Sequence, residues 1–166
     1  GLATDVGLIA PSAKVTTIAD PSQATGIQIA QGQLAFDSDG LRRTNLLFKP
    51  GTSASAVLMD DTSVPLGTMN VRITEFTVGS AGEERMPLDL PPSSAYTYAA
   101  DFRVDEAELL GAKEVEFSQP VVSYTDNFLD LPVGTGVPAG FVDRGDADWV
   151  AGEDSGVVVA VGGEFA

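Results

Sequence analysis

The sequence predicts an all-β fold: a mostly antiparallel β-sandwich with Greek-key-like connections and one short helix. Short runs of apolar and β-branched residues recur about every ten residues, separated by clusters of Gly, Pro and Asp. In the segment 128–150, Pro132 and Pro138 exclude a helix because each removes a backbone donor. We expect one module over residues 1–166, with a less regular N-terminal extension over residues 1–31.

The first half of the chain predicts short strands that end at turns. They are expected at residues 14–18, 26–30, 33–36, 45–49, 54–59 and 70–78. The second and third of these could pair across Gly32, and Asp37 to Gly40 has the composition of a tight turn. In the last run the apolar residues change parity at Thr74-Glu75, which a bulge or burial on both faces would explain.

The second half begins with the regular alternation of residues 95–104, whose apolar face includes Phe102 and is expected to be buried. A helix is expected at 104–111, with Asp105 as N-cap and Gly111 as its stop. A strand is expected at 114–124, in which Pro120 marks an edge or a bulge. Strands at 129–133 and 137–143, joined by a turn at residues 134–136, and a buried strand at 156–161 complete the chain.

Composition excludes several functional classes. The net charge is −15 with only nine basic residues, so nucleic acid and anionic membrane surfaces are poor partners. No apolar run reaches the roughly 18 residues of a membrane-spanning helix. The absence of Cys and His excludes cysteine and histidine zinc sites and Ser-His-Asp triads. We expect no enzyme, because adjacent carboxylates such as Asp60 with Asp61 or Glu83 with Glu84 point apart.

One acidic cluster has the composition of a calcium site. Carboxylates crowd a Gly-containing loop and its flank, and hard oxygen ligands on a flexible loop suit Ca²⁺. The residues are Asp143, Asp146, Asp148, Glu153 and Asp154. Their spacing does not match an EF-hand, and the alternative is that they cap turns on an acidic surface. No other cofactor is expected.

Two weaker candidates also have structural alternatives. Tyr96 and Tyr98 could form a ligand platform, or they could fill the core with their hydroxyl groups at its rim. Asp37 and Asp39 could form a second calcium site, but they supply too few ligands for one.

Five blocks of the chain resemble a known kind of protein. The blocks are residues 32–43, 66–79, 90–99, 115–128 and 131–150. Together they are similar to the segment that precedes the repeats in very large bacterial RHS/YD-repeat surface proteins, over residues 32–159. Residues 104–122 also distantly resemble a ZU5-type β-sandwich. Some ZU5-type domains resemble self-cleaving proteins with a His-Phe-Ser site, but this chain has Glu116-Phe117-Ser118, where a carboxylate poorly replaces imidazole.

The resemblance implies a secreted or cell-surface, non-catalytic module that spaces or docks neighbouring domains of a large bacterial protein. The start at Gly1 likewise suggests a piece excised from a larger chain. The alternative function is a ligand-binding adhesion module that recognises a carbohydrate or a surface protein, with calcium dependence.

Overall fold

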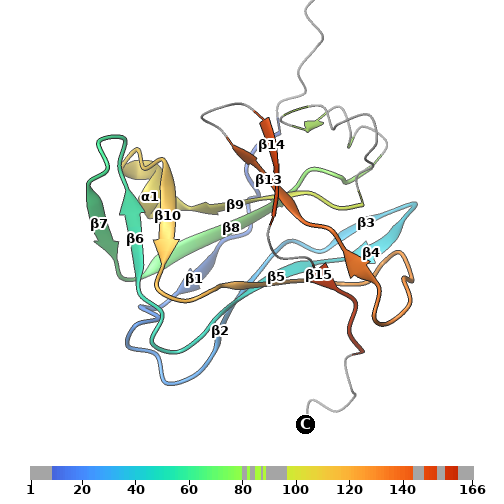
Figure 1. The fold of residues 1–166 in the computed structure, drawn as a ribbon, viewed down its shortest axis with the longest axis horizontal. Coiled ribbons are helices and arrows are strands. Elements are labelled where there is room, and N and C mark those ends of the chain that lie inside the picture. Colours follow the sequence, from blue (N-terminus) through green and yellow to red (C-terminus); the bar gives the residue numbers. More distant parts are fainter. Residues whose placement is uncertain are drawn as a thin grey trace, which may run out of the picture.

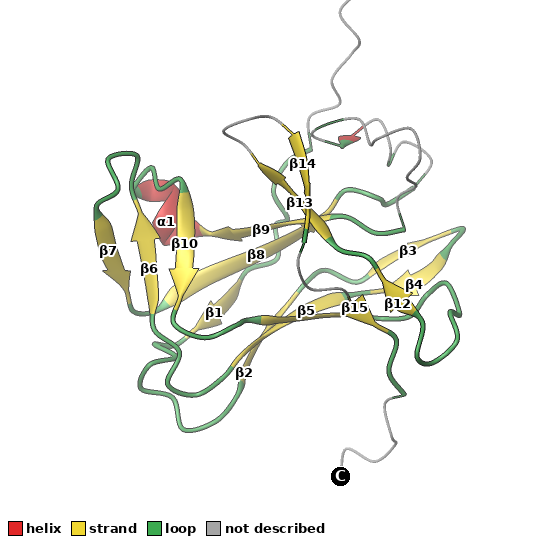
Figure 2. Ribbon diagram, in the orientation of Figure 1, coloured by secondary structure: helices red, strands yellow, loops and turns green. Residues whose placement is uncertain are grey.

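The computed structural model describes residues 9–79, 82, 85, 86, 88, 97–143, 148–152 and 156–160. These residues form mostly antiparallel strands with one short helix, so the predicted all-β class is confirmed (Figure 2). The elements are β1 (Thr16–Ile18), β2 (Gln28–Gln31), β3 (Ala35–Asp37), β4 (Gly40–Arg42), β5 (Thr44–Phe48), β6 (Ala54–Val57), β7 (Ser63–Leu66), β8 (Met69–Glu75), β9 (Ala100–Val104), α1 (Asp105–Leu109), β10 (Glu114–Phe117), β11 (Val122–Thr125), β12 (Gly136–Val137), β13 (Gly140–Asp143), β14 (Asp148–Ala151) and β15 (Gly156–Val157).

The described strands form three three-stranded sheets and three two-stranded ribbons. The sheets have the orders β1-β8-β9, β10-β6-β7 and β11-β5-β2, and the ribbons are β3-β4, β12-β15 and β13-β14 (Figure 1). A sandwich with Greek-key connections stays a prediction, because this division among small sheets does not by itself define two layers. Within the described residues, no helix is long and apolar enough to cross a membrane.

Two long chain segments run side by side and pass from one sheet to another. β5 pairs with β11 and the next strand, β6, pairs with β10, so both segments change sheets together. Pro50-Gly51 interrupts one segment and Pro120 interrupts the other, and the Ser118 N–H donates to the Ser53 carbonyl at 3.0 Å between the two pairings. The single strand predicted at 114–124 is therefore divided into β10 and β11, because proline cannot donate to a ladder. Both strands lie at sheet edges, which agrees with the edge position predicted for Pro120.

The predicted hairpin across Gly32 is wrong. β2 pairs with β5, and the Gly32 N–H extends that ladder to the Thr44 carbonyl at 2.8 Å. A Cβ at Gly32 would lie 2.8 Å from the same carbonyl oxygen, so glycine is needed here for close approach. β3 pairs instead with β4, across the predicted Asp37–Gly40 turn, where Gly40 has φ +120°.

The core lies between the three larger sheets and α1. Its largest fully buried apolar side chains are Phe48, Ile18 and Met69, and the Phe48 ring meets the Phe117 ring edge to face at 5.8 Å between centroids. Helix α1 adds Ala107 and ends at Leu109, with Leu110 as its C-cap. Gly111 follows the cap with φ +66° and is the predicted stop.

Other predictions differ from the structure in the second half of the chain. Asp105 is not the N-cap: Val104 holds that position, and the Asp105 carboxylate pairs with Arg72 at 2.7 Å instead.

Residues 129–133 form no strand, because Asp130 adopts φ 52° and the Asn127 side chain bonds both backbone groups of Leu131. The strand at 156–161 is reduced to β15, which is exposed.

Two expectations about strand faces also change. β8 ends at Glu75, so the parity change at Thr74-Glu75 falls where the strand leaves the sheet. Phe102 lies on the same face of β9 as buried Val104, as predicted, but its side chain is 48% exposed because β9 is an edge strand. Tyr96 lies outside the described residues.

We predict that Phe48→Ala lowers the free energy of unfolding by about 3–5 kcal/mol, because it empties a fully buried site beside Phe117. Phe102→Ala should cost less than half as much, since half of that side chain is already in water. Urea unfolding of both variants measures the difference. Equal losses would show that the β9 face is closed in solution.

Candidate functional site

The β3-β4 hairpin carries its charged residues on one face and its apolar residues on the other. Asp37 lies opposite Gly40 at the turn, and the Asp39 N–H donates to the Asp37 carboxylate at 2.9 Å. Alternation along a strand then places Arg42 on the same face as Asp37, while Phe36 and Leu41 share the opposite face.

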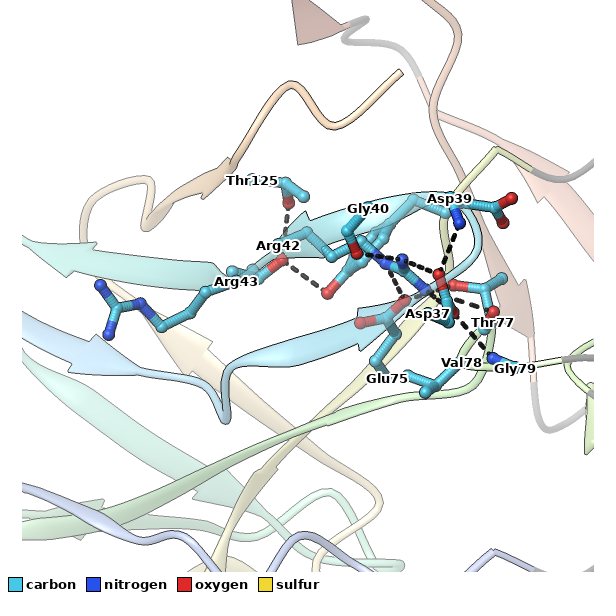
Figure 3. A network of polar contacts seen from close by, with 12 residues as sticks. Asp37, Asp39, Gly40, Arg42, Arg43, Glu75, Thr77, Val78, Gly79 and Thr125 are labelled. Atoms are coloured by element: carbon cyan, nitrogen blue, oxygen red, sulfur yellow. Dashed lines mark hydrogen bonds and ion pairs between the residues drawn. The ribbon is translucent and has the colours of Figure 1, made fainter. Parts of the chain in front are cut away.

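Arg42 is completely buried and uses every N–H of its guanidinium (Figure 3). Two parallel hydrogen bonds of 2.8 Å reach the two Asp37 carboxylate oxygens. Nε donates to Glu75 at 2.6 Å, and the two remaining N–H groups reach the carbonyls of Gly40 at 3.3 Å and Thr77 at 3.4 Å.

Further contacts complete this buried ion network. The Gly79 N–H donates to Asp37 at 2.8 Å, and the Thr77 hydroxyl donates to Glu75 at 2.8 Å. The Arg42 guanidinium carbon lies 4.5 Å from the centroid of the Phe128 ring, within the range of a cation–π contact. The network therefore joins the hairpin to the end of β8 and to the loop after β11.

The network fixes the charge of its members. The Arg42 guanidinium, followed by the Gly79 N–H, holds the pKa of Asp37 well below its usual range. The Asp37 carboxylate in turn raises the pKa of Arg42. Because both oxygens of Asp37 already accept from the protein, the structure does not favour Asp37 and Asp39 as a calcium site.

The opposite face of the hairpin is apolar and exposed. Phe36 and Leu41 lie directly opposite each other and are 77% and 56% exposed. Leu34, just before β3, is also exposed. We call Leu34, Phe36 and Leu41 the hairpin surface. Contiguous exposed apolar side chains on a soluble domain mark interaction sites more often than isolated ones do.

A second open feature lies where β9, α1 and β10 meet (Figure 1). It is a groove of about 270 Å³. The buried lining residues Leu46, Phe48 and Val71 form its floor, and Phe102 and Val115 also line it. We call this the β9 groove. The sequence did not indicate it, because it depends on which strands lie at sheet edges.

Tyr98 is part of the packed interior. The Thr44 hydroxyl donates to the Tyr98 hydroxyl oxygen at 2.6 Å, and the Tyr98 ring packs edge to face on Phe128 at 6.3 Å. Burial raises the pKa of Tyr98 to about 12. The structure thus favours core filling over a ligand platform for Tyr98, with its hydroxyl bonded internally.

The structure brings together two of the five predicted calcium ligands. Asp143 and Asp148 are directly opposite each other in the β13-β14 ribbon, and Asp148 accepts the Trp149 N–H at 2.8 Å. Asp146, Glu153 and Asp154 lie outside the described residues. Among the residues that are described, no group of three metal-ligating side chains is assembled. The calcium site therefore stays a prediction.

The segment Glu116-Phe117-Ser118 takes part in strand pairing and packing. Glu116 is exposed on β10, Phe117 packs on Phe48, and the Ser118 hydroxyl accepts the Ser53 N–H at 2.9 Å. These contacts are those of a structural strand.

No protein-family model, curated protein or solved structure matches this chain. The resemblance to RHS/YD-repeat proteins therefore stays a prediction, and so do the function and the location that it implies.

Sequence reasoning missed the two residues that define the hairpin, Arg42 and Phe36. Arginine is rarely buried, so nothing in the run of residues 40–43 distinguishes Arg42 from Arg43. A usable signal was the alternation Phe36, Asp37 and then Leu41, Arg42 across a tight turn, which places the charged residues on one face and the apolar residues on the other.

We predict that Arg42→Met destabilises the protein by about 3–5 kcal/mol, because it leaves two buried carboxylates without their cation. Lys113→Met is the control: Lys113 pairs with Asp61, and their side chains are 37% and 81% exposed, so its loss should be much smaller. Chemical unfolding measures both. A similar loss in the two variants would contradict the structural role of Arg42.

The low pKa of Asp37 predicts acid sensitivity. The unfolded chain binds a proton at Asp37 near pH 4, whereas the folded chain does not. The contribution of Asp37 is therefore present above about pH 4 and is lost as the pH falls below it. In Asp37→Asn, the loss of stability between about pH 6 and about pH 3 should be smaller than in the wild type. Equal losses would show that Asp37 titrates normally.

For calcium, we predict that millimolar Ca²⁺ raises the melting temperature and changes Trp149 fluorescence. Selective binding to the folded state would add about 2.7 kcal/mol at a hundredfold excess over Kd. Asp143→Asn should weaken both responses, whereas Asp39→Asn should not. Mg²⁺ at equal concentration controls for screening of the −15 charge. An equal effect of Mg²⁺ would show that the cluster is only a solvated acidic surface.

Proposed function

We propose that this chain is a non-catalytic structural and interaction module of a large exported bacterial protein of the RHS/YD-repeat type. It docks a neighbouring domain of that protein through the hairpin surface. The observation that carries the proposal is the pairing of exposed Phe36 with exposed Leu41 on a hairpin whose other face is fixed by buried Arg42.

The hairpin surface has the physical properties of an interface centre. An aromatic side chain flanked by aliphatic ones can bury a large apolar area in a partner. Because the ion network already holds the hairpin backbone, docking would order little beyond the side chains, and less entropy would be lost.

The chemistry of the partner face follows from the same residues. A surface of Leu34, Phe36 and Leu41 needs an apolar pocket, and the high negative charge around it favours a neutral or basic rim. Such a face suits a fixed neighbour in one large protein, where the two surfaces are held at high effective concentration.

A carbohydrate- or protein-binding adhesion module with calcium dependence is the alternative function. It would depend on the cluster around Asp143 and Asp148, which oppose each other in one ribbon. The calcium titration with its Mg²⁺ control, followed by a glycan array with and without Ca²⁺, distinguishes this function from domain docking.

The docking proposal predicts that position 36 is buried in the intact parent protein. The chain has no cysteine, so Phe36→Cys provides a single labelling site for a polarity-sensitive dye. Dye emission should shift to the blue in the intact protein relative to the isolated 166-residue chain.

Met59→Cys is the matched control, because Met59 is as exposed as Phe36 but lies in the turn between β6 and β7. Its dye should report the same aqueous surroundings in both proteins. If the label at position 36 also remains in water in the intact protein, the hairpin surface does not dock a neighbouring domain.

A further inference from the structure

We propose that the β9 groove binds an extended peptide segment that adds a strand to the free edge of β9, with apolar side chains entering the groove and basic residues flanking them. The site is separate from the hairpin surface, so either proposal can fail without the other.

The first observation is the free edge of β9. The Phe76 N–H donates to the Ala99 carbonyl at 2.9 Å, and backbone groups in a strand alternate in direction. Asp101 and Arg103 therefore point their backbone groups towards β8, while Ala100 and Phe102 point theirs away from it. In the described part of the chain, no hydrogen bond reaches these outward groups of Ala100 and Phe102.

The second observation is that the groove beside this edge borders the apolar core and carries Phe102 as an exposed apolar side chain. The groove reaches Phe48, which is buried under the rest of the fold, and Phe102 faces the groove while remaining 48% exposed. An added strand would place every second side chain over this floor and would cover Phe102. The free edge would thus pair with the backbone of an extended peptide, and the adjacent apolar floor would contact its side chains.

The third observation is that β9 lacks the protection seen on another edge. The Leu58 N–H donates to the Thr62 carbonyl at 2.8 Å, so the backbone of Pro65 in β7 points away from β6. Proline there blocks strand addition because it has no N–H to donate. No proline or bulge occurs within β9.

The negative charge of the segment around the groove favours a peptide with basic residues. Residues 100–117 contain six acidic and two basic side chains, a net charge of −4. Both basic residues are already paired, Arg103 with Asp101 and Lys113 with Asp61. Glu114 lines the groove and forms no ion pair within the described residues. A peptide with Lys or Arg on either side of its apolar residues fits this surface, whereas a second copy of a chain with charge −15 would be repelled.

The test uses the synthetic peptide Lys-Val-Thr-Val-Thr-Val-Lys and the 166-residue chain, observed by amide NMR. We expect saturable shifts of the Ala100 and Phe102 amide signals at millimolar peptide. The same peptide with Glu at both ends should bind more weakly at low salt, and high salt should remove this difference.

Two proline variants make the test specific. Ala100→Pro removes an outward N–H without touching the ladder to β8, and it should weaken binding about fivefold or more. Ser63→Pro makes the same change at an outward position of β7 and should leave binding intact. Thermal unfolding verifies that both variants fold.

Three results would overturn the proposal. They are the absence of shifts at Ala100 and Phe102, binding that survives Ala100→Pro, and equal binding of the acidic and basic peptides at low salt. Shifts of the same amides with protein concentration, without peptide, would assign the edge to self-association instead.

Discussion

The hairpin β3-β4 depends on one buried cation. Arg42 is the only charged side chain among the described residues that is completely buried, and all five of its N–H groups have acceptors. Removal of a guanidinium from water is costly, and the cost is offset here only because the geometry leaves no donor unused. The same requirement dictates where Asp37, Glu75, Thr77 and Phe128 must lie. A single desolvated charge thus holds together three segments that are distant in the sequence: the hairpin, the end of β8 and the loop after β11.

This constraint explains how the hairpin surface can remain exposed to water without the hairpin folding back onto the core. A two-stranded ribbon alone is marginally stable, and Phe36 with Leu41 would favour folding back onto the core. The buried network holds the inner face of the ribbon against β8 and against the Phe128 ring, so the outer face remains outside. The exposure of Phe36 is the feature of the hairpin on which the proposed docking role depends.

Sequence patterns predicted elements better than pairings. Turn residues located the ends of β5, β6 and α1 to within two residues, because Pro50-Gly51, Asp60-Asp61 and Gly111 act locally. The partner of β2 was missed because it is set by the close approach of Gly32 to Thr44, a contact between segments that no local pattern encodes. Phe102 shows the same limit: alternation indicated its face, but only the position of β9 at a sheet edge determines its exposure. Arg42 could not be selected over Arg43, since burial of arginine follows from its partners.

Edges and charge together limit which contacts the module can make. Pro65 protects β7, and acidic residues on β10 discourage pairing with another acidic chain. β9 carries its charges, Asp101 and Arg103, as an internal pair, so its edge has neither proline nor unpaired charge to repel a strand. The net charge of −15 still acts on any approaching copy of the chain, and it acts least on a basic segment. The net charge therefore disfavours pairing of the β9 edge with a second copy of the chain and favours the basic segment that we propose.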